Sequence, residues 1–158
     1  MKINTNPKAL YGFVSIGEGV TWAILLSSLL VRAAGFAPSW LVTAAGSIHG
    51  FMFLSYAVMA ALVGVNQRWR ILRILSAVAL AIVPFATVPF DKAMAKKGAL
   101  EGAWRLTKTE DPRDANWFDS LFRWFINRPL VLVLVLLLAV SLVFALLLSA
   151  GPPDQWFK

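Results

Sequence analysis

Two side chains that can carry a proton interrupt long apolar stretches of this 158-residue sequence. Glu18 lies near the middle of the first stretch, and His49, the single histidine, lies inside the second. Inserting an ionisable group deep into hydrocarbon costs about 2.5–3.5 kcal/mol or more, so such a group usually faces protein and has a partner. Glu18 and His49 therefore form either a proton or ligand site or the hydrogen bonds that hold helices together, and we expect the second role.

Neutral imidazole both donates and accepts hydrogen bonds, and the partners open to His49 are Glu18, Tyr56 or a backbone carbonyl. A metal site needs more ligands than one histidine, one buried carboxylate and no cysteine provide, so we expect no metal and no cofactor. An enzyme would need a nucleophile with its base, a carboxylate pair or a metal. The acidic residues around Pro112 instead indicate a solvated turn, so we expect no catalytic residues and a protein that is not an enzyme.

The composition indicates the environment of these side chains. Hydrophobic residues make up 59% of the chain and charged residues 15%, against about 45–50% and about 25% in soluble domains. The mean hydropathy is +0.70. A soluble globule of this size cannot bury so much apolar surface, so we predict an integral membrane protein in contact with the lipid bilayer. The net charge of +7 is attributed to lipid head groups and not to nucleic acid, because no soluble module carries a basic run interleaved with aromatic residues.

Four apolar segments are long enough, at about 20 residues each, to cross the hydrocarbon as helices. They cover residues 9–31, 40–65, 71–90 and 129–150. Lipid offers no partners for backbone groups, and these runs are continuous and not alternating. We therefore predict an all-α polytopic bundle of about four transmembrane helices plus an interfacial amphipathic helix. The first segment is too long for the core of a signal peptide, so we expect it to be retained.

The chain then divides into three parts, which are a three-helix membrane unit (1–93), a charged loop with the interfacial helix (94–128), and a fourth transmembrane helix with a short tail (129–158).

The charged loop contains an aromatic amphipathic helix. Over 115–127 the apolar residues recur at helical spacing, Asp114 or Asn116 is suited to the N-cap, and Pro129 is suited to the first turn of the next helix. We expect this helix to lie in the head-group plane or to dock on a partner protein. Its apolar residues are Trp117, Phe118, Leu121, Phe122, Trp124 and Phe125. A second, weaker surface helix is expected over 93–107.

Small residues at a four-residue spacing predict close contact between the first two helices. The pairs are Ser15 with Gly19 and Gly46 with Gly50. We expect these two faces to meet, with Glu18 and His49 beside the contact. The helix-packing or polar site so predicted comprises Glu18, Gly19, Trp22, Gly46, His49, Gly50, Tyr56 and Pro84.

Basic residues in short loops mark the cytoplasmic side of a membrane protein. The first loop carries only Arg32, whereas the N-terminus and the second loop carry Lys2, Lys8, Arg68, Arg70 and Arg73. We therefore predict a cytoplasmic N-terminus in a bacterial plasma membrane. Four spans would then place the basic third loop outside, against this rule. The alternatives are a reversed topology, or a third segment that enters and leaves on one face; Pro84 within it is otherwise expected to bend a helix.

Three groups of residues together resemble a known family. They are Glu18-Gly19 followed by Trp22; Gly46-Ser47-Ile48-His49-Gly50 with Phe53 and Tyr56; and Pro84-Phe85 with Phe90-Asp91. In this order and spacing, over residues 9–93, they resemble small bacterial integral membrane proteins, common in actinobacteria, that are grouped as domain of unknown function 3817. The resemblance implies a three-helix membrane unit with a buried Glu and His as its signature, and it implies no activity.

Small size, little material outside the membrane and close-packing glycines favour a non-catalytic accessory or scaffold subunit of a larger membrane complex. Its expected partners are other membrane protein subunits or further copies of this chain, and the aromatic helix is the expected docking face. The alternative is a small transporter, or a lipid- or quinone-binding membrane protein, built around Glu18 and His49.

Overall fold

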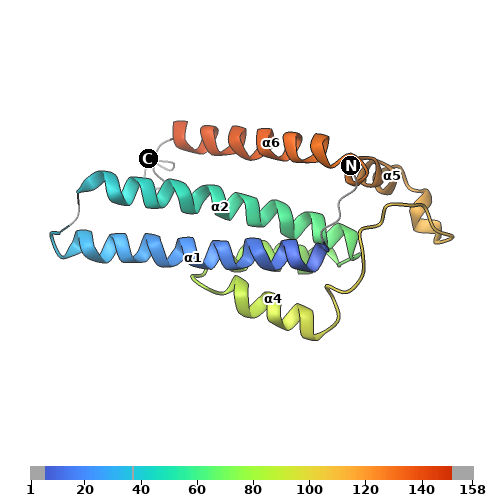
Figure 1. Cartoon of the computed structure of the whole chain (residues 1–158), viewed down its shortest axis with the longest axis horizontal. Coiled ribbons are helices and arrows are strands. Elements are labelled where there is room, and N and C mark those ends of the chain that lie inside the picture. The colour runs from blue at the N-terminus through green and yellow to red at the C-terminus, as the bar shows by residue number, and fades with distance from the viewer. Residues whose placement is uncertain (1–5, 37, 151–158) are drawn as a thin grey trace.

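The computed structural model describes residues 6–36 and 38–150, and all regular secondary structure in these residues is helical. Helices α1 (Pro7–Ala33) and α2 (Ser39–Asn66) are antiparallel and form the most extensive contact, while α6 (Pro129–Ser149) lies along α2 (Figure 1). These three helices are long and apolar enough to cross a membrane. The predicted all-α membrane bundle is confirmed.

Helix α1 begins and ends at residues whose local preferences favour these positions. The side chain of Asn6 accepts a hydrogen bond from the backbone N–H of Lys8 at 2.9 Å, and Pro7 occupies the first turn, where its missing N–H leaves no bond unmade. Beyond the last turn, Gly35 adopts a φ of +80°, a left-handed conformation that favours glycine. The chain then turns back and continues as α2.

The third apolar segment, expected as one spanning helix over 71–90, is a helical hairpin. Its arms are α3 (Ile71–Leu80) and α4 (Thr87–Lys96), each of ten residues and therefore too short to cross a bilayer alone. Between the arms, Pro84 has no backbone N–H to donate, and Phe85 has a φ of 63°. These two residues end the helix, so the segment is broken where a bend was expected.

Both ends of this hairpin lie at the same end of the bundle. Trp69, which precedes α3, donates from its Nε1 to the carbonyl oxygen of Ala99, which follows α4, at 2.8 Å. The turn between the arms reaches the middle of α1, where Trp22 Nε1 donates to the carbonyl oxygen of Ala81 at 3.2 Å. The hairpin therefore has the geometry of the alternative in which the segment enters and leaves on one face.

A close approach between α2 and α3 requires glycine at position 64. A Cβ atom on Gly64 would lie 2.5 Å from Cγ1 of Ile74, far inside contact distance. The chain reverses here through Arg68, which has a φ of 53°, and the N–H of Trp69 donates to the carbonyl oxygen of Gly64 at 2.8 Å. The first arm of the hairpin is thereby held directly against the end of α2.

The surface helix expected over 93–107 does not form, because the helix ends at Lys96. Gly98 and Gly102 adopt φ values of 68° and 109°, which an α-helix does not permit, and the chain continues as an irregular loop. Leu100 and Trp104 of this loop are buried instead. The loop therefore covers the end of the bundle as part of its core.

After this loop, a 3-10 turn η1 (Pro112–Ala115) leads into α5 (Trp117–Ile126), which joins α6. Asn116 caps α5 through a hydrogen bond that its side chain accepts from the N–H of Phe118 at 3.4 Å. The predicted cap and the start of α6 at a proline are thus both present.

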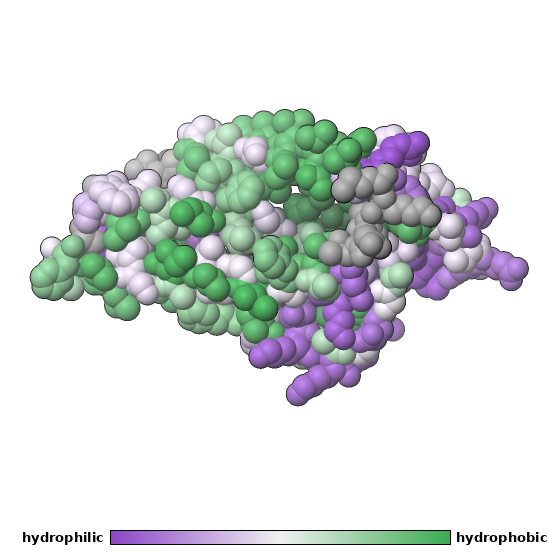
Figure 2. Space-filling model, in the orientation of Figure 1, coloured by the Kyte–Doolittle hydropathy of each residue, from purple (hydrophilic) through white to green (hydrophobic). Residues whose placement is uncertain are grey.

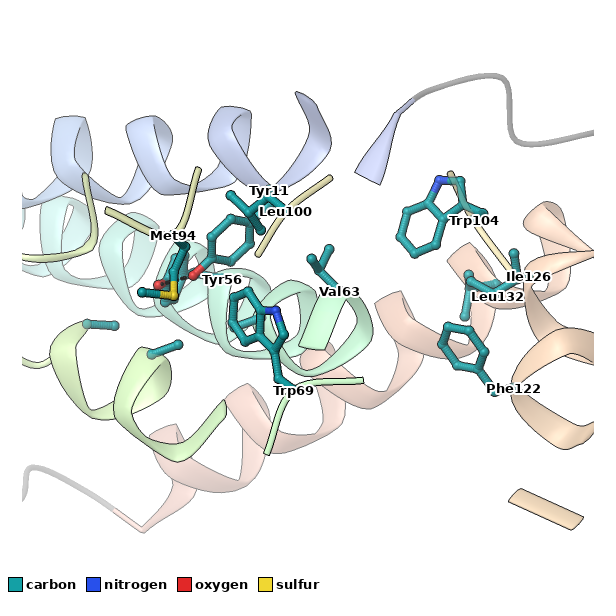
Figure 3. Close-up of a cluster of buried hydrophobic side chains, with 13 residues drawn as sticks. Tyr11, Tyr56, Val63, Trp69, Met94, Leu100, Trp104, Phe122, Ile126 and Leu132 are labelled. Carbon is teal, nitrogen blue, oxygen red and sulfur yellow. Dashed lines mark hydrogen bonds between the residues drawn. The ribbon is translucent and has the colours of Figure 1, made fainter. Parts of the chain in front are cut away.

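Most of the buried apolar side chains form one cluster that runs from the hairpin to the junction of α5 and α6 (Figure 3). It comprises Tyr11, Tyr56, Ala60, Val63, Trp69, Ala77, Ala81, Met94, Leu100, Trp104, Phe122, Ile126 and Leu132. On the face shown in Figure 2, apolar residues cover α1, α2 and α6, whereas hydrophilic residues gather where α4, the loop and α5 lie. We call the end of the molecule that α4, the loop after it (residues 97–116) and α5 form the charged end.

Candidate functional site

Glu18 is completely buried where α1 meets the start of α4. Its Oε2 accepts a hydrogen bond from Oγ1 of Thr87 at 2.6 Å, and that hydroxyl also lies 3.4 Å from the carbonyl oxygen of Ser15. Its Oε1 has no hydrogen-bond partner among the described residues. Glu18 therefore fastens the hairpin to the middle of α1 and leaves one acceptor unused inside the protein.

His49 is buried against α1, and its partner is none of the three groups expected from the sequence. Its Nδ1 lies 3.1 Å from Oγ1 of Thr21, and that hydroxyl donates its single hydrogen to the carbonyl oxygen of Glu18 at 2.9 Å. Because this hydrogen is already used, we assign the donated proton of the His49–Thr21 bond to Nδ1. The imidazole also packs on the indole of Trp22, with ring centroids 4.3 Å apart.

Trp22 packs on His49, but the carboxyl of Glu18 and the imidazole of His49 form separate bonds, each through a threonine that sequence reasoning missed. Thr21 and Thr87 each supply the hydroxyl that makes an interhelical bond. A threonine in an apolar helix commonly bonds to the backbone of its own helix, so its presence gives no signal of a contact with another helix.

Tyr56 lies about two turns along α2 from His49 and bonds to a different residue. Its hydroxyl oxygen is 2.7 Å from that of Tyr11, and the two rings are 5.6 Å apart (Figure 3). Trp69 meets the ring of Tyr11 edge-on at 6.1 Å. Tyr56 therefore belongs to a separate connection between α1 and α2, nearer the charged end.

Two of the predicted small residues face helices other than those expected. A Cβ atom on Gly19 would lie 3.5 Å from Cγ2 of Val88 in α4, and one on Gly50 would lie 3.1 Å from Cε2 of Phe144 in α6. These glycines let α4 approach α1 and let α6 approach α2. The sequence spacing shows that close packing occurs, but it does not show which neighbour packs there.

The contact between α1 and α2 uses other positions. A Cβ atom on Gly17 would lie 3.1 Å from Cε of Met52, and one on Gly46 would lie 3.9 Å from Cδ1 of Leu25. Of the four residues in the two predicted pairs, Gly46 is therefore the glycine whose missing side chain faces this contact.

A second buried polar site, which sequence reasoning missed, lies at the charged end. The carboxylate of Asp114 forms ion pairs of at most 3.4 Å with Arg68, Arg105 and Arg123, and its side chain is 1% exposed. Its Oδ2 accepts hydrogen bonds from the N–H and the hydroxyl of Thr109 at 2.9 and 2.6 Å. In the turn expected to be solvated, Pro112 and Arg113 are exposed, but Asp114 is buried and anchors the loop.

The hydrogen bonds from Thr109, and then the charges of Arg68 and Arg123, lower the pKa of Asp114 to about 2. A carboxyl whose pKa is lower in the folded chain stabilises the fold above its ordinary pKa near 4. This contribution is lost as the pH falls from about 4 through about 2. Asp114 is therefore charged, and its ion pairs are intact, across the neutral range.

Arg105 joins this site to the end of α2. Its Nε donates to the carbonyl oxygen of Asn66 at 2.9 Å and its Nη2 to that of Val65 at 2.8 Å, two groups that a helix leaves unpaired at its C-terminus. Its Nη1 donates to Oδ1 of Asp119 on α5 at 2.6 Å. A single guanidinium therefore caps α2 and links it to α5.

The charged side of α5 faces the protein, and most of its aromatic side faces outward. Asp119 and Arg123 are buried, whereas Trp117 is 74% exposed. Of the six apolar residues predicted to form the interfacial face, the exposed ones are Trp117, Phe118, Leu121 and Trp124. Phe122 belongs to the apolar cluster instead, and the partly buried Phe125 packs against that cluster. The exposed four form what we call the aromatic face of α5.

Three apolar helices of spanning length, a helical hairpin and a set of buried interhelical bonds define a polytopic helical membrane protein. Residues 9–96 match the family described as domain of unknown function (DUF3817), and the chain belongs to this family. The resemblance given by the sequence over residues 9–93 is confirmed. Helices α5 and α6 lie beyond the matched region.

A protein of Streptomyces coelicolor that carries the name "Putative membrane protein SCO5905" is 29% identical to this chain over 91 residues. The aligned residues are 57% of this chain but only 11% of that protein. The aligned part of the chain thus spans about one tenth of the length of this relative. No solved structure matches the chain.

Proposed function

We propose that the chain is a non-catalytic accessory or scaffold subunit of a larger protein complex in a bacterial plasma membrane. The observation that carries the proposal is the use of the buried polar side chains. The bonded pairs are Tyr11 with Tyr56, Glu18 with Thr87, and Thr21 with His49. Polar contacts of this kind are worth about 0.6–2 kcal/mol each in a membrane and hold helices in a fixed arrangement. A scaffold subunit requires helices that are held in a fixed arrangement of this kind.

Two further observations support a role beside other membrane proteins. Helix α6 contacts α2 and α5 and leaves a long apolar surface free for a neighbour, with Leu134, Leu138 and Leu142 each more than half exposed. In the Streptomyces relative, the matching segment is a small part of a much longer chain. A unit that is covalently joined to other segments in one protein is a candidate for non-covalent assembly in another.

The charged end is proposed to face the cytoplasm. Among the described basic residues, Arg32 lies at the opposite end of the bundle. Those at the charged end are Lys8, Arg68, Arg70, Arg73, Lys92, Lys96, Lys97, Arg105, Lys108, Arg113, Arg123 and Arg128. Because the hairpin returns to the end it started from, the basic loop after it lies on the same side as the N-terminus of α1. The conflict between the loop charges and a cytoplasmic N-terminus is thereby removed.

Cysteine labelling tests this orientation, since the sequence contains no native cysteine. A membrane-impermeant maleimide added to intact cells is expected to label Ala34→Cys, in the turn between α1 and α2, and to label Lys97→Cys only after the membrane is permeabilised. Labelling in the reverse order would overturn the orientation. Labelling of both variants in intact cells would show that residues 71–96 cross the membrane.

Purification at native expression tests the accessory role. The tagged chain, solubilised in a mild detergent, is expected to elute in an assembly much larger than its own 17.4 kDa plus detergent, with other membrane subunits in fixed ratio. Trp117→Ala with Phe118→Ala, on the aromatic face of α5, should release those subunits. Phe13→Ala, which removes an exposed aromatic ring from α1, should not. Recovery of the chain alone at every expression level would contradict the proposal.

The alternative is a small transporter, or a lipid- or quinone-binding protein, and one observation favours it. Oε1 of Glu18 is buried without a hydrogen-bond partner among the described residues. Buried acceptors are nearly always paired, so an unpaired one marks a place where a donor from a ligand would be stabilised.

A further inference from the structure

The junction of α5 and α6 forms a small groove at the boundary between polar and apolar surface. It has a volume of about 250 Å³ and is lined by Asn127, Arg128, Pro129, Leu130 and Val131. The first two of these residues are polar and precede α6, whereas the last two begin the 21-residue apolar helix. One side of the groove is therefore suited to a head group and the other to a hydrocarbon chain.

Arg128 is held in this groove without an acidic partner. Its guanidinium lies 4.4 Å from the ring centroid of Trp124, and its Nη1 donates to the carbonyl oxygen of Trp124 at 3.5 Å. It makes no ion pair with any described carboxylate. Stacking on an aromatic ring fixes the plane of a guanidinium and leaves N–H groups at its edge able to donate. A fixed, uncompensated guanidinium is suited to bidentate binding of a phosphate.

Asn127 adds an acceptor beside this charge. Its Nδ2 donates to the carbonyl oxygen of Leu106 at 2.7 Å and to that of Arg123 at 2.9 Å, which uses both amide hydrogens. Its Oδ1 has no hydrogen-bond donor among the residues that the structure describes and can accept from a hydroxyl group. A phosphate donor site next to a hydroxyl acceptor matches the polar part of a phospholipid whose head group carries hydroxyls.

We propose that this groove binds one anionic phospholipid of the leaflet at the charged end. The phosphate is held by Arg128, a head-group hydroxyl donates to Asn127, and an acyl chain lies along Leu130, which is 65% exposed. The aromatic face of α5 lies at the same end, and tryptophan side chains favour the head-group level of a bilayer. The ligand class is phosphatidylglycerol or a lipid with the same phosphate and hydroxyl groups.

Quenching of tryptophan fluorescence by brominated lipids measures this binding directly. The full chain is reconstituted into vesicles of phosphatidylcholine and phosphatidylglycerol, with bromine on one lipid or the other. The signal of Trp124 is obtained by subtracting that of Trp124→Phe. We expect phosphatidylglycerol to be favoured about fivefold beside Trp124, the effect of one basic residue on anionic lipid.

The matched variants are Arg128→Gln and Arg113→Gln, each of which removes one positive charge from the charged end. Arg128→Gln should bring the preference to about one, and Arg113→Gln, whose guanidinium pairs with Asp111 at 2.7 Å, should leave it unchanged. If Arg128→Gln does not fold, Arg128→Lys provides the test, because it keeps the charge and loses the bidentate geometry. Its preference should fall between one and that of the unaltered chain.

Three results would overturn the proposal. The first is equal quenching by the two lipids in the unaltered chain. The second is an equal loss of preference in Arg128→Gln and Arg113→Gln, which would indicate a general surface charge and no site. The third is full displacement of the lipid by inorganic phosphate, which would indicate a site for free anions.

Discussion

Replacing Arg105 by alanine is expected to lower the free energy of unfolding by about 3 kcal/mol, the low end of the cost of removing one partner from a buried ion pair. The loss would leave the carbonyl oxygen of Asn66 without its donor and that of Val65 with only the backbone N–H of Arg68. It would also leave Asp119 with one ion-pair partner fewer. Titration of the protein in mixed micelles with a denaturing detergent, followed by tryptophan fluorescence, measures this change.

Two controls identify the cause. Arg105→Lys keeps the charge but cannot reach α2 and α5 at once, so we expect it to lose more than half of the same stability. Arg113→Ala breaks an ion pair whose arginine is 68% exposed, and exposed ion pairs contribute little to stability. If Arg105→Ala and Arg113→Ala proved equally mild, Arg105 would not hold these elements together.

Replacing Glu18 by alanine is expected to cost about 2 kcal/mol of stability, measured in the same titration. The side chain is completely buried, so its removal leaves a cavity and takes away the acceptor of the Thr87 hydroxyl. Glu18→Gln keeps the volume and an oxygen that accepts from Thr87, so we expect a loss below about 1 kcal/mol. Thr87→Val, which removes the donor at nearly constant volume, should cost about 1 kcal/mol.

The glutamine variant also separates the two proposed functions. An accessory subunit should keep its partners when Glu18 becomes glutamine, because the hairpin stays fastened to α1. A transporter or ligand-binding protein should instead lose transport or binding while its stability is nearly unchanged. If Glu18→Gln were as unstable as Glu18→Ala, the bond to Thr87 would not be the reason that Glu18 stabilises the bundle.

The membrane class, the helical fold and the limits of the long helices could be predicted from the sequence, because each follows from local chemistry. Continuous apolar runs of sufficient length permit few structures other than helices in lipid, and Asn6, Asn116 and Pro129 begin helices through their own side chains. The return of the third segment could not be predicted in this way. Pro84 marks a break, but the direction of the chain after it depends on the bond between Trp69 and Ala99, 30 residues apart.

The charged region shows a second limit of sequence reasoning. The pattern of α5 separates aromatic from charged residues, but it does not show which side faces the protein. In water the apolar side would be buried, whereas beside lipid the aromatic face can lie outward while Asp119 is buried. Arg68 and Arg105, which pair with Asp119, precede α5 in separate parts of the chain, and only the folded structure brings them to it.

A hairpin that returns to its starting surface adds no crossing of the bilayer. It therefore decides whether the chain crosses an odd or an even number of times. With α1, α2 and α6 as the segments that traverse the bilayer, the number of traversals is odd. The start of α1 and the end of α6, which lie at opposite ends of the bundle in Figure 1, would then border different aqueous compartments. Polypeptides fused ahead of Asn6 and after Ala150 would accordingly be exposed to different aqueous compartments. A redox-sensitive or protease-sensitive reporter would therefore give opposite readings at the two junctions.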